Sequence, residues 1–125
     1  MAGGFSVTLP GVTTELFAGI AVADFPRAAE WYGRLFGRDA DVVAHDREVM
    51  WRVTGTGWLY VVEDAGRAGR GLVAIAVPDL DEAVADLRAR GIGSGPITPE
   101  GDAARKSVVT DPEGNSVAFI EVTGA

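Results

Sequence analysis

The chain has 125 residues, a length typical of one domain, so we expect residues 1–125 to fold as a single domain with a core of its own. It has no cysteine, which excludes disulfides and cysteine-based zinc sites and fits a reducing cytoplasm. The formal net charge of −7 argues against a nucleic-acid partner and mildly favours cationic small ligands, although an acidic surface also simply keeps a protein soluble.

The chain begins with MAGGFSVTLPG, which has neither the basic region nor the apolar run of a signal peptide. No stretch of the sequence approaches the roughly 20 apolar residues that a membrane-spanning helix needs. We therefore expect a cytoplasmic protein without a membrane partner.

The first predicted elements are a strand, a helix and three further strands. Residues 17–22 form an apolar run of strand length, and Asp24 follows where a helix N-cap belongs. The helix ends at Gly37 and carries an apolar stripe made of Phe25, Ala28, Ala29, Tyr32 and Phe36. Three strand-like segments come next, at residues 40–45, 48–54 and 57–63.

The second half of the chain repeats the first after a glycine-rich linker, AGRAGRG, at residues 65–71. Residues 72–77 match the first strand, Asp79 matches Asp24, and a second amphipathic helix runs to Gly91. The offset between the matching residues is constant, which indicates a duplicated module rather than a long array of repeats. The flexible linker would also permit the two modules to be exchanged between subunits.

The strands after the second helix are predicted less uniformly than those after the first, because one of the three segments is a poor strand former. Residues 92–102 are rich in Gly and Pro and predict at most a short edge strand. Clear strands follow at 105–110 and 116–122, joined by the turn DPEGN. The sequence therefore predicts two β-α-β-β-β modules, at residues 16–64 and 72–122.

These segments resemble the vicinal oxygen chelate superfamily, which includes glyoxalase I, bleomycin-resistance proteins, fosfomycin-resistance enzymes and extradiol dioxygenases. The resemblance is carried by three stretches, IAVADFPRAAEWYGRLFG, IAVPDLDEAVADLRARG and TDPEGNSVAFIEV. It implies an α+β fold in which the two modules form a curved mixed sheet around a cup-shaped cavity. It also implies a divalent metal inside the cup, held by His, Gln or Glu side chains from the first and last strands of each module.

The metal positions implied by the resemblance carry no standard ligand in this sequence. They fall at Phe17, about Tyr60, Leu72 and Ala118, and three of these side chains have no lone pair. Tyrosine could ligate as phenolate, but its ordinary pKa near 10 makes that costly. We therefore expect no metal, no other cofactor and no catalytic residue, and the sequence favours a protein that is not an enzyme.

The alternation of side chains along each strand assigns a lining to the expected cup. Small residues leave volume there, and two aromatic residues offer flat faces for stacking, which suits an organic ligand, aromatic or cationic. The expected ligand-binding residues are Phe17, Gly19, Trp58, Tyr60, Leu72, Ala74, Ala118 and Ile120. The same residues also suit an ordinary core that lets the modules close together. The alternation leaves open whether Trp51 or Arg52 enters the cup.

Three functions remain open at this point. The first, favoured by the apolar lining, is a binding protein of the bleomycin-resistance type that sequesters a small molecule such as an antibiotic. The second is a metal-dependent lyase, isomerase or dioxygenase of the same superfamily, which the four apolar positions oppose. The third is a structural or regulatory domain whose cup is filled by its own side chains. The resemblance also implies a homodimer in which half-cups complete each other between subunits.

Overall fold

The computed structural model describes residues 13–124, which form two helices, one short 3₁₀ turn and eight strands. Their order confirms an α+β fold built from two β-α-β-β-β modules, the first from β1 to β4 and the second from β5 to β8. The elements are β1 (Leu16–Val22), α1 (Phe25–Phe36), β2 (Val42–His45), β3 (Glu48–Arg52), β4 (Gly57–Glu63), η1 (Ala65–Arg67), β5 (Leu72–Ala76), α2 (Leu80–Ala89), β6 (Thr98–Glu100), β7 (Ala104–Thr110) and β8 (Ser116–Val122).

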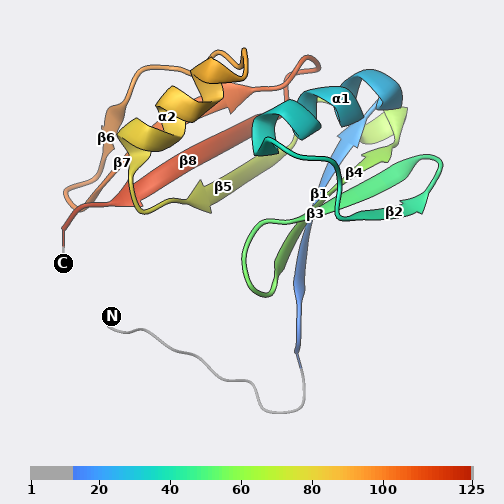
Figure 1. Cartoon of the computed structure of the whole chain (residues 1–125), viewed down its shortest axis with the longest axis horizontal. Coiled ribbons are helices and arrows are strands. Elements are labelled where there is room, and N and C mark those ends of the chain that lie inside the picture. Colours follow the sequence, from blue (N-terminus) through green and yellow to red (C-terminus); the bar gives the residue numbers. More distant parts are fainter. Residues whose placement is uncertain (1–12, 125) are drawn as a thin grey trace.

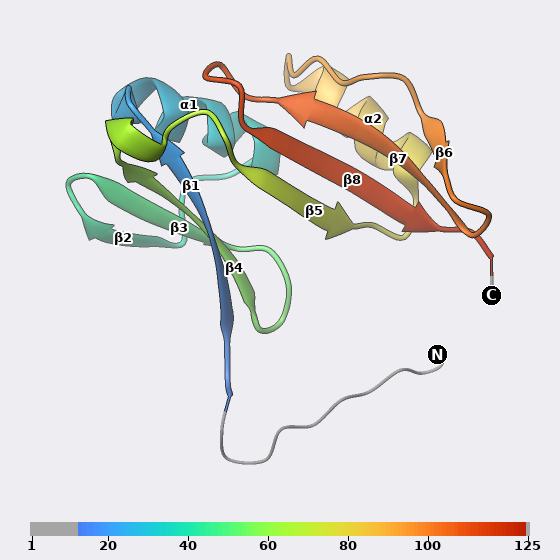
Figure 2. The ribbon, with the colours of Figure 1, turned by 180° about the vertical axis from the view of Figure 1, so that it is seen from behind.

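Each module contributes its own four-stranded mixed sheet. The strand orders are β1-β4-β3-β2 and β5-β8-β7-β6, and in each sheet the first strand of the module runs parallel to the last. Both helices lie on the same side of the two sheets (Figure 1). The view from behind shows the opposite side, where no helix covers either sheet (Figure 2). We call this side the helix-free face of each sheet; the two sheets lie side by side and are not closed into a barrel.

The helices begin and end where the sequence predicts. The Asp24 carboxylate accepts a hydrogen bond from the Arg27 amide at 3.2 Å, and the Asp79 carboxylate accepts one from the Glu82 amide at 3.1 Å. Both aspartates are therefore N-caps, as expected. Gly37 ends α1 at a φ of 71°, a left-handed conformation that glycine adopts at little cost.

One core joins the two modules between the sheets and the helices. Alternate residues of the central strands turn toward the helices and are fully buried, and Tyr32 on α1 packs among them. Trp51 of β3 belongs to this set, with 1% of its surface exposed. The buried residues of β1, β4 and β8 are Ile20, Val22, Leu59, Val61, Val117 and Phe119. Since the helix side holds the core, the helix-free faces are available for other contacts.

The turn between β7 and β8, residues 111–115, attaches the second module to the first, and we call it the clamp turn. The Glu113 carboxylate accepts hydrogen bonds from the amides of Ala23 at 2.7 Å and Asp24 at 2.9 Å. The Asn115 side-chain amide donates to the Ala21 carbonyl at 3.1 Å. This turn therefore completes the N-terminal end of α1 with groups from the other module.

A buried carboxylate organises the clamp turn from within. Asp111 is 4% exposed and accepts from the Tyr32 hydroxyl at 2.9 Å and from the Asn115 side-chain amide at 2.8 Å. It also accepts from the backbone amides of Glu113 and Asn115. Burial, and then the nearby Asp111 carboxylate, raises the pKa of Tyr32 well above its ordinary value, so its hydroxyl stays a donor.

The linker is more ordered than its glycine content suggests. Residues 65–67 form the 3₁₀ turn η1, which the Asp64 side chain caps through the Arg67 amide. Gly71 donates its amide to the Asn115 side chain at 2.6 Å. The segment is thus anchored at both ends and leads directly from β4 into β5.

Candidate functional site

The pairing of β1, β4 and β3 arranges side chains of the helix-free face in rows. Phe17 pairs with Trp58, and Trp58 pairs with Arg52 on its other side. Paired residues of neighbouring strands project from the same face of a sheet. The next row holds Gly19, Tyr60 and Met50. Arg52 therefore lies on the helix-free face, whereas Trp51 is in the core, which settles a question that the alternation left open.

The first row carries two neighbouring aromatic rings, Phe17 and Trp58, which we call the aromatic platform. Their ring centroids lie 6.0 Å apart and the ring planes differ by 15°. The Trp58 indole N–H donates to the Glu15 carboxylate at 2.7 Å, which fixes the ring. The Arg52 guanidinium carbon lies 4.4 Å from the Trp58 ring centroid. A cation–π contact is therefore already made by the protein itself, and a cationic ligand would compete with Arg52 for this ring.

The second row depends on the absence of a side chain at Gly19. A Cβ atom built at this position would overlap the Cζ, hydroxyl and Cε2 atoms of Tyr60. The Tyr60 ring therefore lies across β1, which only glycine at this position permits. Its hydroxyl makes no hydrogen bond to any group within residues 13–124.

Beside Tyr60 lies a small hollow of about 160 Å³ that we call the phenol pocket. It is lined by Gly19, Ala21, Tyr60, Val62 and Arg67. The Arg67 Nε atom donates to the Asp64 carboxylate at 2.7 Å, and this contact raises the pKa of Arg67 and lowers that of Asp64. The pocket thus combines a small apolar floor with two groups that donate hydrogen bonds.

The second module offers a plainer helix-free face. Leu72 pairs with Ser116 and Ala74 pairs with Ala118, and these rows carry no aromatic ring. Leu72 is 86% exposed. Ile120 pairs with Ala76 in the next row. The eight residues expected to bind ligand therefore lie on two surfaces, four on the first sheet and four on the second.

The structure brings members of the two groups together at one place. A hollow of about 180 Å³ between the modules is lined by Trp58 and Ala74, together with Leu16, Ala18, Val53, Thr54, Gly57, Leu59, Val73, Ile75 and Ala76. Phe17 stacks on Trp58 but does not line this hollow, and Gly19 and Tyr60 line the separate phenol pocket. Leu72, Ala118 and Ile120 line neither of these two hollows.

The four positions where the resemblance places metal ligands all lie on the helix-free faces. Phe17, Leu72 and Ala118 have no donor atom, and Tyr60 has one phenol oxygen, which lies over Gly19. In the part of the chain that the structure describes, no group of three or more His, Cys, Asp or Glu side chains is placed to hold a metal ion. This donor set does not fit a divalent cation, which needs several oxygen, nitrogen or sulfur ligands.

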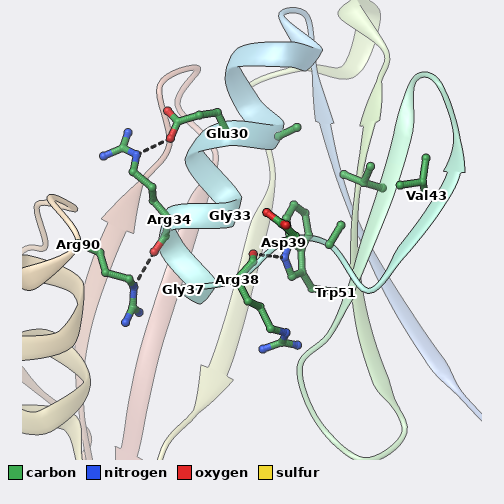
Figure 3. Close-up of a pocket in the computed structure, with 12 residues that line it drawn as sticks. Glu30, Gly33, Arg34, Gly37, Arg38, Asp39, Val43, Trp51 and Arg90 are labelled. Atoms are coloured by element: carbon green, nitrogen blue, oxygen red, sulfur yellow. Dashed lines mark hydrogen bonds and ion pairs between the residues drawn. The ribbon is translucent and has the colours of Figure 1, made fainter.

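A wider hollow of about 770 Å³ lies on the helix side, between α1 and β2–β3 (Figure 3). None of the expected ligand-binding residues lines it. Its arginines are engaged in the fold: Arg34 pairs with Glu30 at 2.7 Å, and Arg90 donates to the Arg34 carbonyl at 2.6 Å. The Trp51 indole N–H donates to the Arg38 carbonyl at 3.1 Å. The sequence did not predict this hollow, which forms because α1 leaves the outer strands uncovered.

Comparison with known proteins assigns the family. The model of the Glyoxalase/Bleomycin resistance protein/Dioxygenase superfamily matches residues 15–119. The chain belongs to this superfamily. A solved glyoxalase/bleomycin resistance protein from Catenulispora acidiphila DSM 44928 is 34% identical, with a TM-score of 0.82, over 88% of this chain and 99% of that one.

More distant structures share the fold. TnmS3, an antibiotic binding protein from Streptomyces sp. CB03234, is 18% identical with a TM-score of 0.72 over 90% of this chain and 98% of that one. A lactoylglutathione lyase from Agrobacterium tumefaciens is 19% identical with a TM-score of 0.70 over 90% of this chain and 96% of that one. No curated protein matches the sequence at a significant level. Within the described residues, neither helix is long and apolar enough to cross a membrane.

Proposed function

We propose that this superfamily member is a binding protein that sequesters a planar aromatic small molecule, such as an antibiotic, on its helix-free faces and without a metal. The observation that carries the proposal is the aromatic platform. Phe17 is 48% exposed although it is a large apolar side chain, and its ring lies nearly parallel to that of the partly exposed Trp58. Such a surface gains free energy when a flat apolar ligand covers it.

The donor set supports binding without metal chemistry. The superfamily's metal positions hold Phe17, Tyr60, Leu72 and Ala118, so the space that ligands of a metal would occupy is lined by apolar atoms and one phenol. Binding requires complementary surface but no catalytic group, and the fold of TnmS3, an antibiotic binding protein, is similar. The position of Arg52 over Trp58 favours a neutral aromatic ligand over a cationic one.

We further propose a homodimer in the cytoplasm. Leu72 is 86% exposed and Val122 is 69% exposed, and both lie on the second sheet. Large apolar side chains that are this exposed often mark a contact surface for another protein. A second copy that lays its first module against this surface would complete a cavity between an aromatic and an aliphatic wall. Light scattering after gel filtration should give twice the mass of the 13.0 kDa chain, and a monomer would contradict the dimer but leave the platform intact.

A set of neutral polycyclic aromatic probes tests the proposed function. We expect binding to shift the indole N–H resonance of Trp58. Trp58→Ser installs the residue found at the matching position of the second module, Ser116. This substitution should weaken the affinity for the probes about tenfold or more, because stacking and buried area are both lost. Val43→Ser, in the helix-side hollow, is the matched control and should bind as the wild type does. Failure of every probe, or a purified protein with one equivalent of divalent metal, would contradict the proposal.

A further inference from the structure

We propose that the phenol pocket recognises a neutral carbonyl oxygen on the ligand, so that the ligand belongs to the class of aromatic ketones. This inference rests on the proposed function and adds the chemical group that gives it selectivity. The pocket adjoins the aromatic platform on the same face, one row further along the sheet.

Two donors point to an oxygen acceptor. The Tyr60 hydroxyl makes no hydrogen bond within residues 13–124, although its ring is held in place over Gly19. Arg67 uses its Nε atom for Asp64, while its terminal nitrogens have no hydrogen-bond partner in that part of the chain. A ligand that covers the Tyr60 hydroxyl must supply an acceptor, because a donor left unpaired when it is buried costs free energy. Arg67, whose side chain is 83% exposed, offers a further donor at the rim of the pocket.

The charges around the pocket favour a neutral acceptor over a carboxylate. Asp64 lies 2.7 Å from Arg67 and compensates its positive charge. Glu48 pairs with Val62, a residue that lines the pocket, so its side chain projects from the same face, and it is 20% exposed. A carboxylate entering here would face Arg67, whose charge Asp64 already compensates, with the Glu48 carboxylate on the same face of the sheet. A ketone oxygen accepts the same hydrogen bonds without that repulsion.

The spacing between platform and pocket gives the ligand its approximate size. Trp58 and Tyr60 are two positions apart on β4, which corresponds to roughly 7 Å along a strand. A fused bicyclic ring with a carbonyl substituent spans this distance, with its ring on the platform and its oxygen in the pocket.

Three probes of similar shape separate the contribution of the carbonyl group to the affinity from those of the aromatic ring and of a negative charge. They are 2-acetonaphthone, which carries the carbonyl, 2-ethylnaphthalene, which lacks it, and 2-naphthoate, which carries a charge. Calorimetric titration of the wild type should give an affinity about tenfold higher for the ketone than for the hydrocarbon, because the hydrocarbon would cover the Tyr60 hydroxyl without offering it an acceptor. The naphthoate should bind more weakly than the ketone.

Variants test whether the preference for the ketone over the hydrocarbon arises at the phenol pocket. Tyr60→Phe should lower the affinity for the ketone toward that for the hydrocarbon, and Arg67→Gln should lower it by a smaller factor. Arg70→Gln removes a similar charge from the exposed part of the linker and should leave the preference unchanged. Equal affinities for ketone and hydrocarbon in the wild type, or tighter binding of naphthoate, would overturn the inference while leaving the proposed function standing. If none of the three probes binds, the proposed function itself fails.

Discussion

The two modules follow the same path but differ in what they present on their helix-free faces. Phe17 and Trp58 form a row on the first sheet, whereas the matching row of the second sheet holds Leu72 and Ser116. The helix-covered faces, by contrast, are apolar and buried in both modules. Packing under the helices thus constrains one face of each sheet to apolar residues, whereas the uncovered face differs in side chains between the modules.

The modules also differ in the turn before their last strand. The clamp turn of the second module bonds to Ala21, Ala23 and Asp24 of the first. The corresponding turn of the first module, residues 53–56, makes only hydrogen bonds within its own module among the described residues. One module thus carries the aromatic platform and the other carries the groups that hold the two together.

The largest effect should follow from removing the carboxylate of the clamp turn. Asp111→Ala leaves the buried Tyr32 hydroxyl without its acceptor and removes one of the two acceptors of the Asn115 side-chain amide. Since each unsatisfied buried group costs about 1–3 kcal/mol, the free energy of unfolding should fall by about 3 kcal/mol or more. Urea titration followed by circular dichroism measures this change.

The matched control lies in the turn of the first module. Thr54 is exposed, and Thr54→Ala should change the free energy of unfolding by less than about 0.5 kcal/mol. Similar losses of stability in Asp111→Ala and Thr54→Ala would contradict the proposal that only the turn of the second module holds the two modules together.

The next effect concerns the close approach of β1 and Tyr60. Gly19→Ala places a methyl group where the Tyr60 ring lies, whereas the matching position of the second module already holds Ala74, beside Ala118. The Tyr60 ring must swing away, and overpacking of this kind costs about 1–3 kcal/mol. Affinity for 2-acetonaphthone should therefore fall about tenfold.

Gly93→Ala is the control for this substitution, because a Cβ atom there meets no other atom within 4 Å. Its affinity for 2-acetonaphthone should equal that of the wild type. Unchanged binding by Gly19→Ala would show that the position of Tyr60 does not matter to the site.

Alkaline pH should loosen the contact between the modules at Tyr32. Burial, and then Asp111, raises the pKa of this hydroxyl above its ordinary value of 10.0 in the unfolded chain. The unfolded state therefore releases a proton above pH 10 that the folded state keeps, and stability falls by up to about 1.4 kcal/mol per pH unit. Below pH 10 this contribution is fully present.

Thermal unfolding between pH 9 and pH 11 measures how steeply the stability falls with pH. The Tyr32→Phe variant has no hydroxyl to titrate and should lose this part of the pH dependence, although it is less stable throughout because Asp111 loses a donor. An identical slope in both proteins would assign the alkaline effect to other groups.

Local patterns in the sequence predicted much of the fold. A strand has a strict period of two, so alternation assigns Ile20 and Val117 to one face and Phe17 and Leu72 to the other, and the structure buries the first pair against the helices. The aspartate caps were equally clear, since a cap involves groups only three residues apart. The metal positions could be located only through the family resemblance.

Contacts between distant residues escaped the sequence analysis. The bond from Ala23 to Glu113 joins residues 90 positions apart, and nothing in the turn sequence indicates its partner. The position of Arg52 over Trp58 depends on the pairing of β3 with β4, which the turn between them fixes. The phenol pocket required both the pairing of Gly19 with Tyr60 and the return of Arg67 from the linker.

The smallest effect should come from the feature in which the modules agree most. Asp24→Ala and Asp79→Ala each remove a helix N-cap, and each should lower the free energy of unfolding by about 1 kcal/mol. The two costs should be alike because each helix keeps a second carboxylate at its N-terminal end, Glu113 for α1 and Glu121 for α2. Asp24→Asn and Asp79→Asn retain a side-chain acceptor and should cost less. Urea titration that shows one cap worth more than twice the other would mean that the helices, like the helix-free faces and the turns, have diverged between the modules.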